Sequence, residues 1–329
     1  MENILVTGVG GGVGQSIIKA LEDTTYRVVG VDSEELAAGL HAVPKAYKGC
    51  YATDTSYIDR LLEICRKEQC RLIFAGQDVE LLPLSRHAQR FRSEGIVPVV
   101  SSAEVIRICD DKLATHEFLK THGFTVPETK PLSEVTSFQR PVVLKPQKGG
   151  NRSRATYVAY SSEELNIYRK LVDPDNCIVQ EHVEGDEFTC GSITLENKCH
   201  GAIIMRRILR DGDTYKAFVD HPSPLEPLVR AIVEALKPFG PCNVQLRVKN
   251  GVPYVFEINA RCSGTTASRA LAGFNEPKII ADYLLNETVP EFNIREISIL
   301  RYWNELVVSN SRIEQLRRTR SLEGDGTRL

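Results

Sequence analysis

The sequence predicts an α/β protein in which a doubly wound parallel-sheet domain precedes an α+β region. Early in the 329-residue chain, apolar runs typical of buried strands alternate with amphipathic helices. Further along, one helix is followed by several strand-like runs, which is typical of an α+β region. We therefore expect a doubly wound domain at 1–108 and an α+β region at 109–306, followed by a loosely held, partly helical tail at 307–329.

Each element of the first domain follows from its local pattern. A buried strand at 3–7 leads into a glycine-rich turn that opens a helix. A helix at 56–70 carries its apolar side chains on one stripe, formed by Ile58, Leu61, Leu62 and Cys65. The other strands are expected at 27–33, 71–76 and 96–102.

The rest of the chain is richer in strands. A helix at 112–123 comes before them. A helix at 228–236, a β-hairpin around an Asn250-Gly251 turn and two further helices to about residue 285 come after them. The strands themselves are expected at 141–146, 155–160, 177–183, 187–196 and 199–209.

Composition restricts the class of protein. The formal net charge is −2, so no global positive field would recruit nucleic acid. The nine cysteines include no Cys-x-x-Cys pair, which favours reduced thiols in a cytoplasm over a disulfide framework or a zinc site. No apolar run approaches the length of a membrane span, and the N-terminus lacks the pattern of a signal peptide. We expect a cytoplasmic protein without nucleic-acid or membrane partners.

The second strand of the hairpin carries the most informative polar residues. Side chains two apart on a strand share a face, so Glu257, Asn259 and Arg261 are expected to lie together. Phe256 and Ile258 are expected to point the other way, into the core. Oxygen ligands beside a fixed guanidinium suit Mg²⁺ with phosphate. The alternative interpretation is a solvated strand face.

The glycine-rich turn after the first strand has the shape of a dinucleotide site. Gly8, Gly11 and Gly14 follow a G-x-x-G-x-x-G spacing, and Asp32 ends the second strand. The stricter G-x-G-x-x-G spacing is absent, and similar turns occur in α/β sheets that bind no nicotinamide. Binding of NAD(P) and binding of the carboxylate or phosphate of another substrate both remain open.

Basic residues and a polar strand end suggest a nucleotide site. Lys145 ends a strand, and the segment 148–154 combines glycines with cations and a serine, which suits a lid over phosphates. The strand that ends at Val183 can present backbone groups to a purine, and a carboxylate beyond it can accept from ribose hydroxyls. Arg207 or Lys216 would face the same cleft. For each motif alone, a solvated loop or surface charge is the alternative.

In this order the motifs resemble those of the ATP-grasp superfamily. Residues 1 to about 300 are similar to the large subunit of carbamoyl-phosphate synthetase and to its single-unit relatives, the amino-acid ligases of the pyrrolysine-pathway type. The likeness is strongest where this chain has NVQ and EINAR and the family has NVQ and EVNPR. The resemblance implies a Rossmann-like first domain at 1–108, a small lid subdomain at 109–190 and a C-terminal subdomain with the metal site at 191–306. In this family, two antiparallel sheets clamp ATP.

The resemblance also implies roles for individual residues. It assigns the phosphates to Lys112 and Lys145, beneath a lid that includes Lys148, Gly149, Gly150 and Ser153. It assigns the adenine to Glu181, His182 and Val183, and the ribose to Glu187. It assigns Mg²⁺ to Gln245, Glu257 and Asn259. We take Arg261, Lys145 and Arg207 as the catalytic cations.

The chain departs from the family where the acceptor should bind. Ala260 replaces the usual proline, and the run at 261–266 replaces a serine-rich one, so the substrate does not carry over. We expect Ser263 and Gly264 at the acceptor. Four further residues are expected to face an amino-acid substrate, namely Gly11, Gly12, Asp78 and Glu80.

These features predict an ATP-dependent, ADP-forming carboxylate–amine ligase that acts through an acylphosphate and uses Mg²⁺, with Mn²⁺ expected to substitute. The chain carries one set of motifs, so we do not expect it to make carbamoyl phosphate, which requires two phosphorylations. An NAD(P)-dependent oxidoreductase and a non-catalytic nucleotide-binding module are the alternatives. The sequence fits small-molecule carboxylate and amine substrates and is compatible with a homodimer, but it identifies neither substrate.

The hairpin register decides whether Gln245 belongs to the metal face. A two-residue Asn250-Gly251 turn without a bulge would set Gln245 opposite Phe256, away from Glu257. We therefore expect a three-residue loop at 249–251, which pairs Val248 with Val252 and sets Asn243 opposite Glu257.

Overall fold

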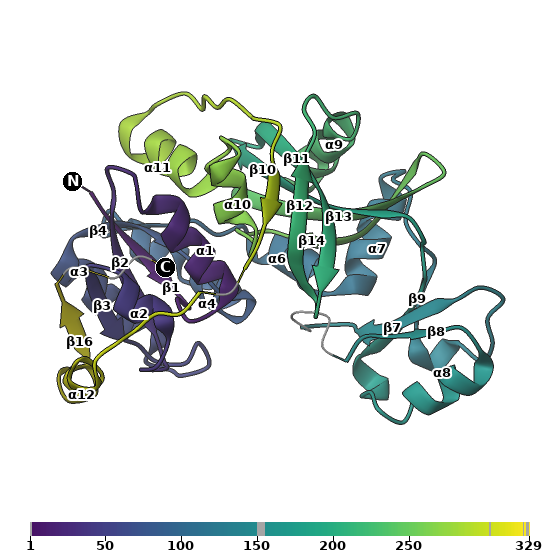
Figure 1. Cartoon of the computed structure of the whole chain (residues 1–329), viewed down its shortest axis with the longest axis horizontal. Coiled ribbons are helices and arrows are strands. Elements are labelled where there is room, and N and C mark those ends of the chain that lie inside the picture. The colour runs from purple at the N-terminus through teal and green to yellow at the C-terminus, as the bar shows by residue number, and fades with distance from the viewer. Residues whose placement is uncertain (1, 150–154, 303, 325, 327–328) are drawn as a thin grey trace.

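Three sheets organise the chain in the computed structural model, which describes residues 2–149, 155–302, 304–324, 326 and 329 (Figure 1). The first is a mostly parallel sheet near the N-terminus. The second and third are antiparallel, and the bound nucleotide expected from the sequence would lie between them. The predicted succession of a doubly wound domain and an α+β region is confirmed.

The N-terminal sheet has the strand order β16-β3-β2-β1-β4-β5, and β1 to β5 pair in parallel. Alternate residues of β1 enter different cores, because Ile4 and Val6 pack on one face and Leu5 on the other. Its strands are β1 Asn3–Thr7, β2 Arg27–Asp32, β3 Lys45–Lys48, β4 Cys70–Phe74 and β5 Val97–Pro98. Its helices are α1 Gly12–Leu21, α2 Ala38–Ala42, α3 Tyr57–Glu68, α4 Asp78–Arg86, α5 Ala88–Arg92 and α6 Ala103–Asp110.

The C-terminal tail is docked on this sheet, so the expectation of a loosely held segment is wrong. Its helix α12 Asn310–Thr319 leads into β16 Ser321–Glu323, which pairs antiparallel with β3. Leu316 and Leu322 are buried in the N-terminal core. These two leucines anchor an Arg-rich segment to residues near the other end of the chain, such as those of β3.

The antiparallel sheets have four and six strands, with orders β6-β9-β7-β8 and β14-β13-β10-β11-β12-β15. The chain passes from one to the other between Glu181 and Asp186, slightly before the boundary expected at residue 190, which falls inside β10. The subdomain division itself stays a prediction. The smaller sheet and its helix comprise β6 Thr129–Pro131, β7 Val142–Pro146, β8 Tyr157–Ala159, α8 Ser162–Tyr168 and β9 Cys177–Glu181. Helix α7 Lys112–Thr121 precedes this sheet and packs into the core of the larger one. The larger comprises β10 Asp186–Leu195, β11 Lys198–Arg210, β12 Asp213–Val219, α9 Glu226–Leu236, β13 Gly240–Lys249, β14 Val252–Asn259, α10 Thr266–Leu271, α11 Glu276–Asn286 and β15 Ser298–Leu300.

The β13–β14 hairpin reaches the required register by a different route from the one expected. Its turn has two residues, since Lys249 pairs with Val252, so the three-residue loop is wrong. A bulge in β14 then restores the phase and sets Gln245 opposite Glu257. Val255 takes the core position, and Phe256 lies beneath the ammonium of Lys145, 5.3 Å from Nζ to the ring centre. The prediction that Phe256 points into the core is therefore also wrong, as is the pairing of Asn243 with Glu257, because Asn243 pairs with Asn259.

The N-terminal domain packs on the larger antiparallel sheet through α1, α10 and α11. The Ala267 N–H donates to Ser16 Oγ at 2.7 Å, and Asn275 Nδ2 donates to the Ala20 carbonyl at 2.6 Å. These contacts hold the glycine-rich turn close to the end of β14.

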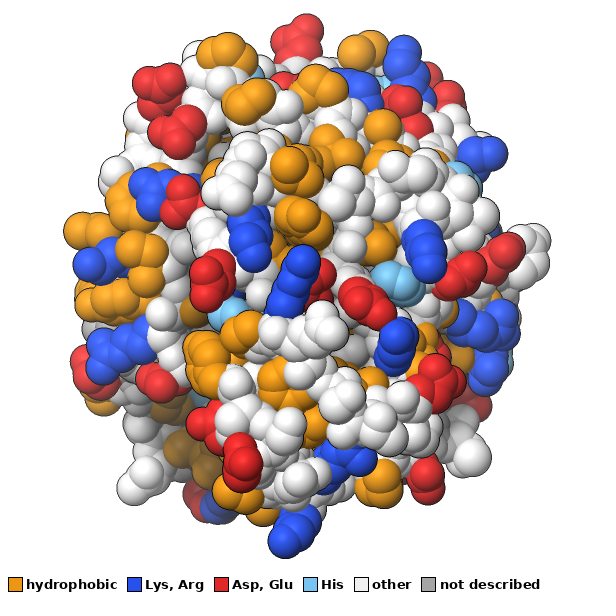
Figure 2. All heavy atoms as spheres, turned by 90° about the vertical axis from the view of Figure 1, so that its right-hand side faces the viewer, with side chains coloured by type: hydrophobic (Ala, Val, Ile, Leu, Met, Phe, Trp, Pro, Cys, Tyr) orange, Lys and Arg blue, Asp and Glu red, His pale blue; other side chains and the backbone are white. Residues whose placement is uncertain are grey.

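The face of the molecule drawn in Figure 2 is not dominated by charges of one sign. On the side shown in Figure 2, acidic, basic and hydrophobic side chains are interspersed. Across the residues that the structure describes, no helix is long and apolar enough to cross a membrane.

Candidate active site

Two adjoining cavities meet at the polar face of the β13–β14 hairpin. The interface pocket, about 480 Å³, lies between the glycine-rich turn at Gly10–Gly12 and the hairpin. The lid pocket, about 250 Å³, lies between the four-stranded sheet and the same hairpin. Both are lined by Lys112, Arg207, Gly212, Gln245 and Glu257. The shared residues therefore form the junction between two binding spaces.

The lid pocket gathers the residues predicted to bind a nucleotide. Its lining includes Lys145, Glu181, His182, Val183 and Glu187. Burial lowers the pKa of Lys145 to about 8, with Glu257 opposing the shift and Lys112 adding to it. No described residue forms an ion pair with this ammonium. A buried cation without a counter-ion favours an anionic ligand in the pocket.

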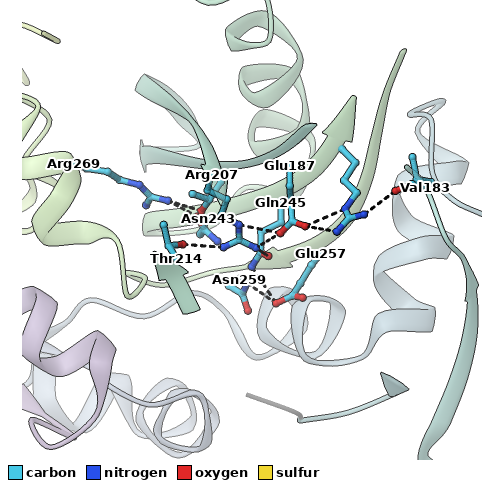
Figure 3. Close-up of polar contacts among 11 residues, drawn as sticks. Val183, Glu187, Arg207, Thr214, Asn243, Gln245, Glu257, Asn259 and Arg269 are labelled. Carbon is cyan, nitrogen blue, oxygen red and sulfur yellow. Dashed lines mark hydrogen bonds and ion pairs between the residues drawn. The ribbon is translucent and has the colours of Figure 1, made fainter. Parts of the chain in front are cut away.

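Glu187 is held differently from the expectation that it binds a ribose. Its Oε1 accepts from Arg207 Nε and Nη2 at 3.0 and 2.6 Å, and its Oε2 accepts from Arg247 Nε and Nη2 at the same distances (Figure 3). Burial alone would raise the pKa of Glu187, but the two guanidiniums outweigh it and lower the pKa. The carboxylate thus fixes two arginines. The contact with a ribose stays a prediction, although both oxygens of Glu187 already accept hydrogen bonds from four arginine N–H groups.

Glu257 is the open carboxylate of the hairpin. Its Oε1 accepts from Gln245 Nε2 at 3.2 Å and from Asn259 Nδ2 at 3.0 Å (Figure 3). No described residue donates to its Oε2. The predicted convergence of these three side chains is therefore present in the geometry, while their binding of a metal stays a prediction.

The donor set fits a hard cation that also binds phosphate. One carboxylate and two amide oxygens are present, and Gln245 Oε1 already accepts from Arg207 Nη2 at 2.6 Å. Each amide oxygen keeps a second lone pair for a metal. No cluster of three or more His, Cys, Asp or Glu side chains in the described ranges is arranged for a metal. Because Mg²⁺ prefers octahedral coordination, the three side chains alone would leave positions for oxygens of a nucleotide or of water.

Arg261 joins the hairpin to the N-terminal domain. Its Nε and Nη2 donate to the two carboxylate oxygens of Asp78 at 2.6 and 2.9 Å. Burial alone would raise the pKa of Asp78, but this bidentate pair outweighs it and lowers the pKa. Arg261 Nη2 also lies 3.4 Å from Asn259 Oδ1, next to the Glu257 face. Asp78, predicted to face substrate, therefore lines the pocket while it fixes a guanidinium.

The structure brings most of the other predicted residues to the interface pocket. Its lining includes Gly11, Gly12, Gly149, Ser263 and Gly264. Lys148 is not among the lining residues of either pocket, because its exposed ammonium faces Asp111 at 3.5 Å. Gly150 and Ser153 lie outside the described residues.

Glu80 does not reach the pocket, so its predicted place facing substrate is wrong. Its Oε2 accepts from Thr7 Oγ1 at 2.7 Å and from the N–H groups of Gly76 and Gln77 at 3.2 and 3.0 Å. Its Oε1 accepts from the Tyr57 hydroxyl at 3.0 Å. The side chain closes the start of α4 and is buried behind it.

The carboxylate of Asp32, at the end of β2, forms a hydrogen bond with the backbone of the glycine-rich turn. Asp32 accepts from the Gly10 N–H at 2.7 Å and from the Glu34 N–H at 3.0 Å, one bond to each oxygen. A dinucleotide site would need such a carboxylate for the ribose. This geometry counts against NAD(P) and leaves the turn as one wall of the interface pocket.

Several residues that line the interface pocket were not predicted from the sequence, among them Asn243 and Arg301. Asn243 lies on the pocket face two residues before Gln245, and the period of the strand could have identified it. Arg301 enters from the end of β15, where its Nη1 donates to the Thr214 carbonyl at 3.1 Å. No local pattern around Arg301 indicated this contact.

Comparison with known proteins agrees with the predicted fold. Residues 4–100 match the family described as PylC-like, N-terminal domain, and residues 173–305 match ATP-grasp in the biosynthetic pathway with Ter operon. D-alanine--D-alanine ligase A of Bacillus cereus is 25% identical over 240 residues, which cover 63% of this chain and 79% of that protein. The carbamoyl phosphate synthase large chain of Pseudothermotoga lettingae is 26% identical over 317 residues, 86% of this chain but 27% of its own length.

A solved structure extends the likeness over nearly the whole fold. The ADP complex of N5-carboxyaminoimidazole ribonucleotide synthetase superimposes with a TM-score of 0.73 at 15% identity, covering 97% of this chain and 84% of that one. Together with the two family matches, this confirms the resemblance inferred from the motifs. The chain therefore carries an ATP-grasp domain behind a PylC-like N-terminal domain, and it is similar to D-alanine--D-alanine ligase A and to the carbamoyl phosphate synthase large chain.

Proposed function

We propose that this protein is an ATP-dependent, ADP-forming ligase that joins a carboxylate to an amine through an acylphosphate, with amino-acid-like substrates. The observation that carries the proposal is the junction at Gln245 and Glu257, which line both pockets. A phosphoryl donor in the lid pocket and an acceptor in the interface pocket would meet there.

The nucleotide would occupy the lid pocket. Lys145 and Lys112 are buried, and Lys112 Nζ donates to the Gly149 carbonyl at 3.0 Å, at the root of the predicted lid. Both ammonium groups would lie against the phosphates, with the backbone of the 181–183 strand end against the adenine. Arg207, fixed by Glu187, would provide a further positive charge at the junction.

Glu257, Gln245 and Asn259 would hold Mg²⁺, or Mn²⁺ in its place, together with phosphate oxygens. When bound, the cation would neutralise negative charge on the phosphates. The residues themselves keep the junction in shape, because both amides donate to the one carboxylate.

In the reaction, a carboxylate oxygen of the acid attacks the γ-phosphorus of ATP, and the bond to ADP breaks. The amine nitrogen then attacks the acyl carbon, phosphate leaves, and the nitrogen loses a proton. Arg261, held by Asp78, would face the transferring group from the substrate side. Because the acid and the amine are held together in the interface pocket, attack by the amine would be faster than hydrolysis of the acylphosphate by water.

The amino-acid assignment rests on the pocket walls and on the relatives. Gly11, Gly12, Ser263 and Gly264 offer backbone and hydroxyl groups around a space of about 480 Å³, which suits two small polar molecules. The likeness to D-alanine--D-alanine ligase A, at 25% identity, supports the same substrate class.

A phosphate-release screen tests the proposal. The purified protein is incubated with Mg²⁺, ATP and the common L- and D-amino acids, singly and in pairs. We expect ADP and phosphate to form only with particular acids. Bicarbonate with ammonia should give nothing above background, since one set of motifs serves one phosphorylation. Formation of carbamoyl phosphate from those two, or stabilisation by NADH instead of Mg·ATP in thermal unfolding, would contradict it.

A further inference from the structure

A fully buried ion pair lies directly behind the interface pocket. Arg269 of α10 donates from Nη1 to Glu276 Oε1 of α11 at 2.8 Å, and both side chains are 0% exposed. Glu276 Oε2 accepts from Thr266 Oγ1 at 3.0 Å. Burying such a pair costs desolvation that a hydrophobic pair would avoid, so its stability alone is a weak reason for it.

The pair reaches the pocket through Asn243. Arg269 Nη2 donates to Asn243 Oδ1 and to Thr189 Oγ1, the latter at 3.1 Å (Figure 3). The Thr189 hydroxyl donates to the same Asn243 oxygen at 2.7 Å. Both Asn243 and Thr189 line the interface pocket.

This network fixes which way the Asn243 amide faces. A guanidinium can only donate, so the atom that faces Arg269 must be the amide oxygen. The NH₂ group therefore faces away from the pair, and no described group accepts from it. A neutral hydrogen-bond donor is thus held at the wall of the pocket in one orientation.

The backbone of β10 leaves room for the Arg269–Glu276 ion pair. A Cβ on Gly191 of β10 would lie 2.5 Å from Arg269 Nη1 and 2.6 Å from Glu276 Oε1. Any other residue at this position would displace the guanidinium or the carboxylate. Gly191 pairs with Asn243 across β10 and β13. The space left by the missing Cβ therefore lies at the same point of the sheet as the hydrogen bonds that hold Asn243.

We propose that Arg269 and Glu276 are positioning residues, which hold Asn243 so that its NH₂ group donates to a carboxylate oxygen of the acid substrate. The proposal rests on the proposed function, because it concerns the acid that is phosphorylated. Asn243 pairs with Asn259 across the hairpin, so an acid bound there lies beside the Glu257 face. A neutral donor holds one oxygen without forming an ion pair with the carboxylate, which leaves the other oxygen nucleophilic.

Asn243→Asp tests the donor. The aspartate keeps an oxygen for Arg269 and Thr189, so the fold should persist, but it turns an acceptor to the pocket. With the best acid of the screen, we expect kcat/KM for the acid to fall at least about tenfold, while the Kd of Mg·ADP changes by less than about twofold. An acid kcat/KM within about threefold of the wild type would overturn the proposal.

Gly191→Ala and Ser192→Ala test the positioning. The first displaces the ion pair without changing any polar group, and the second removes a buried hydroxyl on the same strand that bonds only to the Cys242 carbonyl. We expect Gly191→Ala to lower kcat/KM for the acid and Ser192→Ala to leave it unchanged. Equal effects of both variants would contradict a positioning role.

A binding measurement separates this inference from the proposed function. In protein labelled with ¹⁵N-asparagine and bound to Mg·ADP, the Asn243 NH₂ signals are assigned by their loss in Asn243→Asp. We expect sodium acetate to shift these signals in the wild type and not in Gly191→Ala. Signals that acetate does not move overturn the inference even if ligase activity is found; a shift supports it even if the amino-acid screen is negative.

Discussion

Glu80 and Glu257 are two acidic side chains that were both predicted to belong to the site, Glu80 facing the substrate and Glu257 binding Mg²⁺, but their surroundings differ. In the N-terminal domain, both oxygens of Glu80 are bonded, to Thr7, Tyr57 and two backbone N–H groups. On the hairpin, Glu257 uses one oxygen for two amides and turns the other toward the junction of two pockets. The difference teaches that a carboxylate whose oxygens are all satisfied holds the fold, whereas one with an open oxygen is available for chemistry.

The largest effect is expected at the open carboxylate. Glu257→Gln keeps the size of the side chain and removes its charge. We expect turnover with Mg·ATP to fall at least about a hundredfold, or roughly 2.7 kcal/mol of transition-state stabilisation. Thermal unfolding should change little, because the face is polar and adjoins a cavity. A folded variant with near-normal turnover would remove Glu257 from the site.

At the closed carboxylate, the effect should fall on stability. Glu80→Ala leaves two hydroxyls and two backbone N–H groups without their acceptor. We expect the free energy of unfolding, measured with urea, to fall by about 1–3 kcal/mol. At a temperature where the variant is folded, its kcat should stay within about threefold of the wild type. A hundredfold loss of kcat in the folded variant would contradict a purely structural role for Glu80.

Asp78 combines both roles, and its effect should be intermediate. Asp78→Asn removes the charge that holds Arg261 in a bidentate pair. We expect kcat/KM for the acid to fall about tenfold, because the guanidinium gains freedom at the junction. Asp59→Asn breaks an exposed pair with Arg90 and serves as the matched control, with no expected kinetic effect. An Asp78→Asn variant as active as this control would make the Asp78–Arg261 pair purely structural.

The smallest effect concerns the charge of Lys145. With a pKa lowered to about 8 by burial, its ammonium is mostly protonated at pH 7 and mostly neutral at pH 9. Since the charged form would bind phosphate, the affinity for Mg·ATP should fall about fivefold as the pH rises over this range. Lys145→Arg stays charged and should abolish the pH dependence. A wild-type affinity that is flat from pH 7 to 9 would count against a phosphate contact.

The sequence was sufficient for most of the fold because the patterns were local. Alternation of strands and helices, and the apolar stripe of α3, predicted the N-terminal domain. The docking of the tail through Leu316 depends on partners at the other end of the chain, which no local pattern encodes.

The site was predictable where residues share one strand and not where they meet across the fold. Glu257 and Asn259 follow from strand period, but the register that brings Gln245 beside them depends on a bulge that composition does not reveal. Thr7 and Tyr57 donate hydrogen bonds to Glu80, and Arg269 donates one to Asn243. In each case the partners are far apart in sequence, so no local pattern predicts the contact.

We propose above that the acid is activated as an acylphosphate at the junction of the two pockets. The direct test uses the acid identified in the screen, labelled with ¹⁸O in both carboxylate oxygens, and mass spectrometry of the released phosphate. The account predicts one ¹⁸O atom in each phosphate, with ADP formed in equal amount. Unlabelled phosphate, or release of AMP and pyrophosphate, would contradict it.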